Sequence, residues 1–354
     1  MKVLFWGTPA YAVPSLDALV AAGHHVVGVV SQPDRRRGRG KELVPSPVKV
    51  RALALNVPVF TPERIRRDLE CQQQLANLGA DLSVVVAFGQ ILPPDVLAQP
   101  PLGCWNGHGS LLPRWRGAGP IQWSLIEGDA ETGVGIMAME SGLDTGPVLL
   151  ERSIPIGLLE NAQHLGERLA ALTAELLVEA MPKIEAAGIG SEPERLARLG
   201  VRLQSEEGLT YARLLTKEDF KIDWSQPGLV IHRRVMGLYP DALSSWQGKR
   251  LKLLATEPLV QRLAQQLSPE AAALAARWGQ TPGEGSTAMP ANSGTAAAPG
   301  TVLAIAAEQG VVIATGGCPV LLREAQLEGK RACSGMALIQ QLGVCVGDRL
   351  GEER

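Results

Sequence analysis

The chain begins with the stretch MKVLFWGTPAYAVPSLDALVAAGHHVVGVV (residues 1–30), which predicts a strand, a helix and a second strand in succession. Val3–Trp6 is a short apolar run that ends at a glycine, as a buried parallel strand does. Pro14–Ala22 has its larger apolar residues on one helical face, and His25–Val30 is the next predicted strand. A strand, a crossover helix and a parallel strand form the unit from which right-handed α/β sheets are built.

The same alternation continues through the first half of the chain. Asp81–Ala87 (DLSVVVA) predicts a strongly buried strand. Further elements are predicted as strands at Val57–Phe60, Val134–Met139 and Val148–Ile154, and as helices at Ile65–Leu78 and Leu165–Ile184. We therefore expect an N-terminal Rossmann-like α/β domain over residues 1–189, with a parallel sheet and helices on both of its faces.

The pattern changes after a charged, glycine-containing segment at residues 190–205, which we interpret as a linker. Short strands without intervening helices follow, for example at Gly300–Ile305 and Gly310–Ala314. They predict a C-terminal OB-like β-barrel domain over residues 206–354. We expect a disordered insertion at about 263–299, because its Pro/Gly/Ser/Thr/Ala tract cannot bury enough apolar surface to order itself.

The composition is that of a globular protein of two domains, with 354 residues, 45% of them hydrophobic and 20% charged. A net charge of -2 means that binding to nucleic acid would need a local basic surface. The five cysteines are widely spaced, no C-x-x-C occurs, and no apolar run could span a bilayer. We expect a cytoplasmic protein without a bound metal or a membrane anchor, acting as a monomer, although no sequence pattern sets the oligomeric state.

Three polar side chains stand out in two glycine-rich stretches, CWNGHGSLLPRWRGAGPIQ (residues 104–122) and SGLDTGPV (residues 141–148). Asn106 and His108 are two positions apart, so on an extended segment they point to the same side. Asp144 lies in a loop flanked by glycines, which allow the backbone to approach a ligand closely. An amide, an imidazole and a carboxylate suit acyl transfer without a protein nucleophile. On the residues alone, the alternative that they cap turns and solvate a loop stays open.

The order of these motifs resembles that of the folate-dependent formyltransferases, and within them the methionyl-tRNA formyltransferase family. The motifs read NGHGSLLP at residues 106–113, RGAGP at 116–120 and GLDTG at 142–146. The resemblance covers most of the chain and includes Phe5–Pro9, Gln32–Asp34, Pro45–Lys49, Ala87–Pro93, Thr216–Glu218 and Ile222–Trp224.

The resemblance implies that the chain transfers a formyl group from 10-formyltetrahydrofolate to the α-amino group of methionyl initiator tRNA. It implies that Asn106 and His108 donate to the oxyanion that forms, and that Asp144 holds His108 and helps to move a proton from the amine to the departing folate nitrogen. The implied folate-binding residues are Ser110, Leu111, Leu112, Pro113, Phe88, Gly89, Ile91 and Leu92.

A basic loop, DRRRGRGK at residues 34–41, follows the second predicted strand, where open α/β sheets bind ligands. The resemblance implies that this loop meets the acceptor end of tRNA, through Arg35, Arg36, Arg37, Arg39 and Lys41, with Arg39 as the strongest candidate. Lys249 and Arg250 would add a basic face in the C-terminal domain. For both sets, a solvated polar surface is the alternative interpretation.

Two other functions stay open at this point. A formyltransferase acting on a small amine, such as an amino sugar nucleotide, would use the same three polar residues but would need neither basic surface. A folate-binding or tRNA-binding protein without catalysis would not need Asn106, His108 and Asp144 together.

Overall fold

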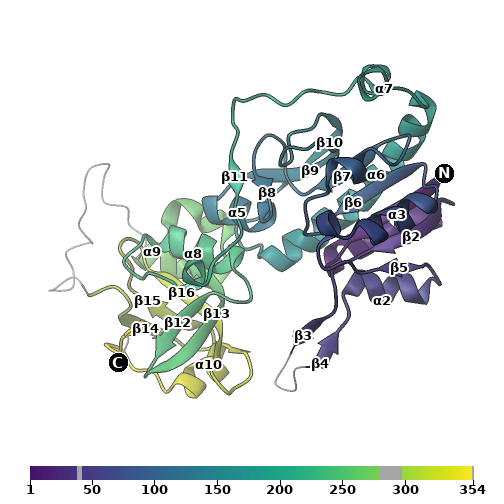
Figure 1. Cartoon of the computed structure of the whole chain (residues 1–354). Helices are drawn as coiled ribbons and strands as arrows, with labels where there is room; N and C mark the ends of the chain where they lie inside the picture. The colour runs from purple at the N-terminus through teal and green to yellow at the C-terminus, as the bar shows by residue number, and fades with distance from the viewer. Residues whose placement is uncertain (38–41, 279–296, 353–354) are drawn as a thin grey trace. The chain divides into compact units, whose positions relative to one another are not determined.

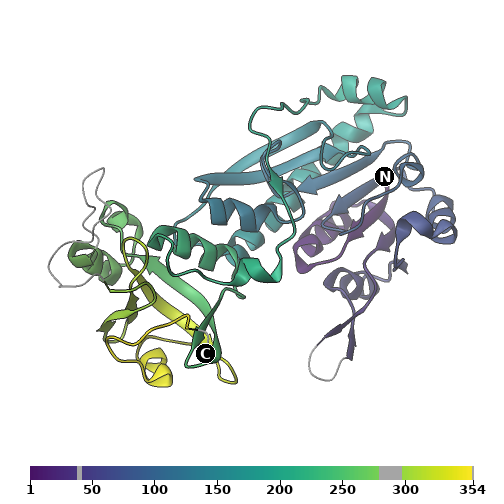
Figure 2. The ribbon, with the colours of Figure 1, turned by 60° about the vertical axis from the view of Figure 1, so that its left-hand side comes forward.

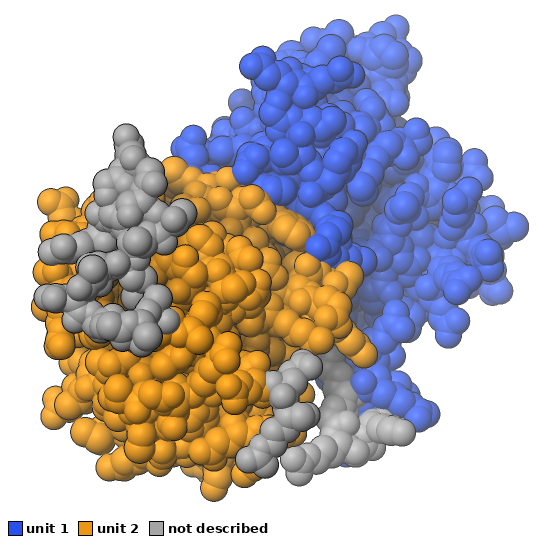
Figure 3. Space-filling view, turned by 90° about the vertical axis from the view of Figure 1, so that its left-hand side faces the viewer, with its two compact units in different colours: residues 1–120, 131–155, 166–214 blue, residues 121–130, 156–165, 215–354 orange. Residues whose placement is uncertain are grey.

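The computed structural model describes residues 1–37, 42–278 and 297–352. The chain forms two compact units, which Figure 3 shows in different colours. Unit 1 comprises residues 1–120, 131–155 and 166–214, and unit 2 comprises residues 121–130, 156–165 and 215–354. The expected domain bounds, 1–189 and 206–354 with a linker between them, stay a prediction. Within the described ranges, no helix is both long and apolar enough to cross a membrane.

Unit 1 is built on a seven-stranded sheet with the order β10-β9-β7-β6-β1-β2-β5 (Figure 1). Its strands are β1 (Lys2–Gly7), β2 (His25–Val30), β5 (Val59–Phe60), β6 (Leu82–Val86), β7 (Cys104–His108), β9 (Glu131–Ala138) and β10 (Val148–Pro155). The strands from β7 to β5 are parallel, as expected. β9 pairs antiparallel with both β7 and β10, so the sheet is mixed. The connection from β9 to β10 is too short for the crossover that a parallel pair requires.

Helices flank this sheet and complete its core. They are η1 (Ala10–Ala12), α1 (Val13–Ala21), α2 (Pro47–Ala54), η2 (Ile65–Arg67), α3 (Leu69–Asn77), α4 (Pro94–Leu97), α6 (Ala162–Ala187, in unit 1 from residue 166) and α7 (Glu192–Leu199). Strands β1 and β6 are almost wholly buried, and Trp6 Nε1 donates to Ser83 Oγ between them at 3.2 Å. The predicted helix at 65–78 is divided, because Asp68 caps α3 by accepting from the Cys71 amide at 3.0 Å.

Two short pairs of strands lie outside the main sheet of unit 1. The hairpin β3 (Arg35–Arg37) and β4 (Glu42–Val44) stands out from the sheet (Figures 1 and 2). β8 (Arg116–Gly117) pairs in parallel with β11 (Tyr211–Ala212). The segment expected as a linker contains α7, whose first turn has a capping box between Ser191 and Glu194.

Unit 2 contains an antiparallel sheet with the order β12-β13-β16-β15-β14, in which β17 pairs with β16. Its strands are β12 (Leu243–Trp246), β13 (Lys249–Pro258), β14 (Val302–Ala306), β15 (Gly310–Ile313), β16 (Val320–Leu327) and β17 (Cys333–Ser334). The C-terminal segment reaches both edges of the sheet. Leu350 donates its amide to Gly300 O at 2.9 Å beside β14, and Gly351 donates to Ser245 O of β12 at 3.0 Å. The short antiparallel strands are those expected of an OB-like domain, and the C-terminal segment contacts β12 and the residues just before β14.

The predicted disordered insertion is wrong for residues 263–278. The helices of unit 2 are α5 (Pro120–Glu127, in unit 2 from residue 121), η3 (Lys217–Phe220), α8 (Gly228–Gly237), η4 (Gln261–Gln266), α9 (Pro269–Trp278) and α10 (Gly335–Leu342). Ala271 and Ala275 of α9 pack in a buried apolar cluster with Val312 and Leu321 of the sheet. Packing of this apolar face stabilises the helix. The prediction of disorder came from the composition of the low-complexity tract, which begins only after the helix ends. Residues 279–296 of the predicted insertion lie outside the described residues.

Candidate active site

Asn106 and His108 lie on β7, inside the sheet of unit 1. Asn106 faces Val85 of β6 and Met137 of β9 in the ladder. Because side chains alternate along a strand, the two residues point to the same face of the sheet, as expected. His108 is 6% exposed and Asn106 is half-buried, so β7 carries both groups into largely desolvated surroundings.

Asp144 lies in the loop that joins β9 to β10. Its φ of 52° is in the left-handed region, which residues other than glycine adopt at a cost. The Gly117 amide donates to Asp144 Oδ2 at 2.8 Å, so the carboxylate already holds one hydrogen bond to the backbone. The strained backbone and this bond fix the direction of the side chain.

The structure brings the three polar side chains together. Asn106 Nδ2 lies 3.4 Å from Asp144 Oδ1, and His108 Nδ1 lies 3.8 Å from Asp144 Oδ2. The carboxylate is therefore shared between the amide and the imidazole. This arrangement contradicts the alternative in which Asp144 only solvates a loop.

The second imidazole nitrogen of His108 is also engaged. Nε2 lies 2.9 Å from Trp115 O, and because a carbonyl oxygen only accepts, Nε2 carries the hydrogen. Nδ1, the nitrogen beside Asp144, is then an acceptor in the neutral ring, and it can donate to a reacting oxygen only once the imidazole has taken up a proton. The spacing of the motifs alone does not indicate which of the two nitrogens of His108 is bound to a backbone carbonyl.

The cysteine on β7 does not provide a nucleophile. Burial raises the pKa of the Cys104 thiol to about 12, so the thiol stays protonated at neutral pH.

The eight expected folate-binding residues divide by burial. The side chains of Phe88, Leu92, Ser110 and Leu112 are buried, while Leu111, Pro113, Gly89 and Ile91 have exposed surface. Phe88 packs edge-on against Trp6 with ring centroids 5.2 Å apart, and the Ser110 hydroxyl donates to Arg114 O at 2.6 Å.

The basic hairpin carries exposed arginines on β3. Arg35 and Arg36 are exposed and stand opposite Val44 and Leu43 in the ladder. At the base of the hairpin, Lys49 Nζ contacts the Asp34 carboxylate at 2.9 Å. Arg37 belongs to β3 by its backbone, and Arg39 and Lys41 lie outside the described residues.

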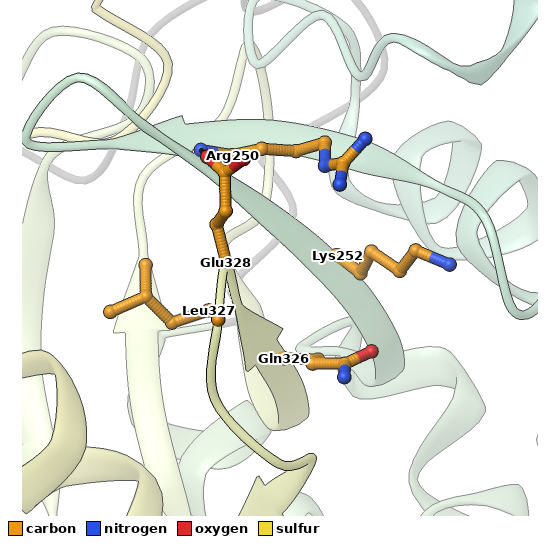
Figure 4. Close-up of a pocket in the computed structure, with 6 residues that line it drawn as sticks. Arg250, Lys252, Gln326, Leu327 and Glu328 are labelled. Atoms are coloured by element: carbon orange, nitrogen blue, oxygen red, sulfur yellow. Dashed lines mark hydrogen bonds between the residues drawn. The ribbon is translucent and has the colours of Figure 1, made fainter. Parts of the chain in front are cut away.

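Unit 2 has a shallow basic hollow of about 250 Å³ on its sheet, lined by Arg250, Lys252, Gln326, Leu327, Glu328 and Gly329. Arg250, Lys252 and Gln326 point to the same side, whereas Leu327 points away (Figure 4). Lys252 pairs with Asp241 at 2.6 Å, but the Arg250 guanidinium has no partner among the residues that the structure describes. Lys249, the other expected residue, is exposed and neighbours Arg250 on β13, so its side chain points to the opposite face.

Sequence reasoning did not identify the backbone partners of the site. The Trp115 carbonyl and the Gly117 amide contact His108 and Asp144, and such groups leave no signature of residue type. In the described parts of the chain, no group of three or more His, Cys, Asp and Glu could hold a metal ion.

Family models match both halves of the chain. The family model for formyl transferase matches residues 1–181, and that for the formyl transferase C-terminal domain matches residues 214–343. A methionyl-tRNA formyltransferase from Synechococcus sp. strain WH7803 is 66% identical over 351 residues, covering 99% of this chain and 98% of the relative. One from Synechococcus sp. strain RCC307 is 68% identical over 344 residues, covering 97% of this chain and all of the relative.

Solved structures share the fold at low identity. The sugar 3N-formyl transferase WlaRD, crystallised with dTDP and 5-N-formyl-THF, has a TM-score of 0.56 at 15% identity and covers 94% of this chain and 99% of its own. HypX from Aquifex aeolicus, in complex with tetrahydrofolic acid, has a TM-score of 0.56 at 15% identity over 98% of this chain and 48% of its own. From the two family models and the full-length relatives, the chain belongs to the formyl transferase family, among the methionyl-tRNA formyltransferases.

Proposed function

We propose that the chain moves the formyl group of 10-formyltetrahydrofolate onto the α-amino group of methionine carried by initiator tRNA. The observation that carries the proposal is the convergence of Asn106, His108 and Asp144, with Asp144 oxygens 3.4 Å from the amide nitrogen and 3.8 Å from the imidazole Nδ1. These groups can bind an oxyanion and handle a proton, and formyl transfer to an amine requires both.

The nucleophile needs little activation. A free α-amino group has a pKa of about 7.7–8.0, and the electron-withdrawing ester lowers it, so much of the amine is neutral at physiological pH. The amine nitrogen forms a bond to the formyl carbon, and the electron pair of the carbonyl double bond moves to its oxygen. The Asn106 amide has two hydrogens, of which one faces Asp144. The second donates to the developing oxyanion, a contact typically worth about 3 kcal/mol.

Collapse of the tetrahedral intermediate breaks the bond from carbon to N10 of the folate. The ammonium nitrogen must lose a proton, and the departing N10 must gain one. Asp144 and His108 Nδ1 handle this proton, because they are the ionisable atoms beside the amide. The products are formylmethionyl-tRNA and tetrahydrofolate, and no atom of the protein is consumed.

Binding of tRNA relies on local basic surfaces, since the chain has a net charge of -2. In unit 1 these are the hairpin arginines Arg35, Arg36, Arg37 and Arg39 with Lys41, and in unit 2 they are Lys249 and Arg250. Exposed arginines suit contacts to phosphate, and a small amine substrate would need none of them.

The test is an assay with three amine substrates presented together with 10-formyltetrahydrofolate. They are methionyl initiator tRNA, methionyl elongator tRNA and an amino sugar nucleotide, with products resolved by mass spectrometry. We expect that the initiator tRNA is formylated at a lower concentration than either of the other two substrates. Formylation of the sugar nucleotide with neither tRNA modified would contradict the proposal.

A further inference from the structure

We propose that Gln204 is a positioning residue that holds the Asp144 loop in its reactive conformation, as part of a backbone strap formed by residues 201–214. The inference rests on the proposed function, because it assigns a role in that reaction. The sequence predicts residues 190–205 as a linker, and a plain linker would have no specific contacts with the catalytic loops.

The Gln204 side chain uses both ends of its amide. Nε2 donates to Asp144 O at 2.8 Å and to Gly146 O at 2.7 Å. Oε1 accepts from Arg116 Nε at 2.9 Å. One half-buried side chain therefore joins the loop that carries the catalytic carboxylate to the loop that begins after Pro113.

These contacts lie at the places where the site needs support. Asp144 has a φ of 52°, a conformation that persists only where the surroundings determine it. Arg116, which is 9% exposed, directly precedes Gly117, whose amide donates to Asp144 Oδ2. Gln204 therefore fixes both the backbone of Asp144 and the residue next to the donor of its carboxylate.

The same strap also reaches His108. Thr210 Oγ1 accepts from the Trp115 amide at 2.9 Å, and Thr210 O accepts from the Arg116 amide at 3.0 Å. Trp115 in turn accepts from His108 Nε2 through its carbonyl, and it has a φ of 62°. The strap thus contacts Trp115 and Arg116, which lie at or next to the backbone groups that orient His108 and Asp144.

The strap is anchored on its N-terminal side. Arg202 and Val148 exchange two backbone hydrogen bonds of 2.8 Å, and Arg202 Nη2 contacts Glu151 at 2.9 Å. On its C-terminal side, β11 pairs with β8 at Arg116 and Gly117. With both ends fixed to unit 1, Gln204 can transmit rigidity to the Asp144 loop.

The experiment compares Gln204→Ala, Gln204→Glu and the matched control Leu203→Ala in the full chain. Gln204→Glu keeps an acceptor for Arg116 but places an acceptor-only group against the two carbonyls. Leu203 is the neighbouring strap residue and is 77% exposed. Steady-state formyl transfer to methionyl initiator tRNA and local hydrogen exchange are measured for each protein.

For both Gln204 variants we expect kcat to fall by about 100-fold, because a misplacement of about 1 Å at a catalytic group costs on that order. The KM for tRNA should change by less than about twofold, since the strap touches the reacting groups and not the basic surfaces. Amide exchange should speed up in residues 112–118 and 140–147 but stay unchanged in β6. If Gln204→Glu does not fold, the kcat and the hydrogen exchange of Gln204→Ala test the inference without it.

Two results would overturn the inference. Activity of Gln204→Ala equal to that of Leu203→Ala would show that the site does not need the side chain. Faster exchange throughout the sheet, β6 included, would show a general structural role instead. Failure of the proposed function looks different, because the wild type and Leu203→Ala would then both lack transfer to tRNA.

Discussion

Asn106 Nδ2 and Asp144 Oδ1 lie 3.4 Å apart, although 38 positions separate the two residues in the sequence. Asn106 belongs to a central strand, whereas Asp144 belongs to an exposed loop with a left-handed backbone. The rigid sheet supplies the amide, and the loop brings the carboxylate to it. This division of roles makes the effect of changing each residue predictable.

Replacing Asn106 with alanine should lower kcat by about 100-fold to 1,000-fold, the usual result of removing one preorganised oxyanion donor. Folding should be preserved, because the side chain is only half-buried and its hydrogen bond joins it to the Asp144 side chain in an exposed loop rather than to the core. Single-turnover formyl transfer and thermal unfolding measure the two effects. An Asn106→Ala protein with wild-type kcat would remove the amide from the mechanism.

His108→Gln should lower kcat by about 100-fold to 10,000-fold, the range that a positioned acid or base contributes. The glutamine amide can still donate to Trp115 O, which accepts from His108 Nε2 at 2.9 Å, but it cannot take up a proton. The control is His164→Gln, at an exposed position on α6. If both variants retain full activity, proton transfer at this site does not use His108.

The hairpin arginines should control affinity for tRNA without affecting the chemical step. Arg36→Ala should raise the KM for tRNA and lower the slope of log affinity against log salt by about 1, as the loss of one phosphate contact does. Arg39→Ala should have the same effect. Arg66→Ala, at an exposed position of η2, serves as the control of equal charge change. Identical salt slopes in all of these variants would argue against a role of the hairpin in tRNA binding.

His232 in unit 2 should make stability depend on pH. Burial lowers its pKa from 6.5 to about 4, with Thr256 Oγ1 3.0 Å from Nδ1 and Leu158 O 2.7 Å from Nε2. The folded state holds the imidazole neutral, so this stability is fully present above pH 6.5 and is lost as the pH falls towards 4. By pH 5 the loss should reach about 2 kcal/mol, from 1.5 units at about 1.4 kcal/mol each.

Urea denaturation at pH 8 and pH 5 measures this effect. The difference between the two midpoints should be smaller for His232→Gln than for the wild type, whereas His164→Gln should behave as the wild type does. An unchanged pH dependence in His232→Gln would assign the acid sensitivity of the chain to other groups.

Much of the first unit follows from the sequence, for reasons that are local. The buried runs of β1, β2 and β6 are apolar on both faces, and the intervening glycines and the proline near the start of α1 mark the ends of elements. The direction of β9 and β10 does not follow from such runs, because it depends on the length of the loop that joins them. Helix α9 was not predicted, because the low-complexity tract that follows it dominates the composition of the segment. Its apolar face nevertheless packs on the sheet.

The three polar side chains of the candidate site could be predicted from the sequence, but the residues that hold them in place could not. Asn106, His108 and Asp144 have residue types whose chemistry indicates acyl transfer, and they do meet. Gln204 lies in a charged segment between predicted domains, where a polar residue is ordinary. Two of its hydrogen bonds go to backbone carbonyls, which leave no pattern in the residue types. The third goes to the side chain of Arg116, 88 positions away, and depends on the path of a distant segment.

The most direct test of the central claim is single-turnover formyl transfer to methionyl initiator tRNA by Asp144→Asn. Asparagine keeps an oxygen for the Gly117 amide, so the loop stays in place while the negative charge beside His108 is lost. We predict a fall in the rate of transfer of at least about 100-fold, with unchanged binding of tRNA. A rate within twofold of the wild type would contradict the account, because the carboxylate would then have no part in the reaction.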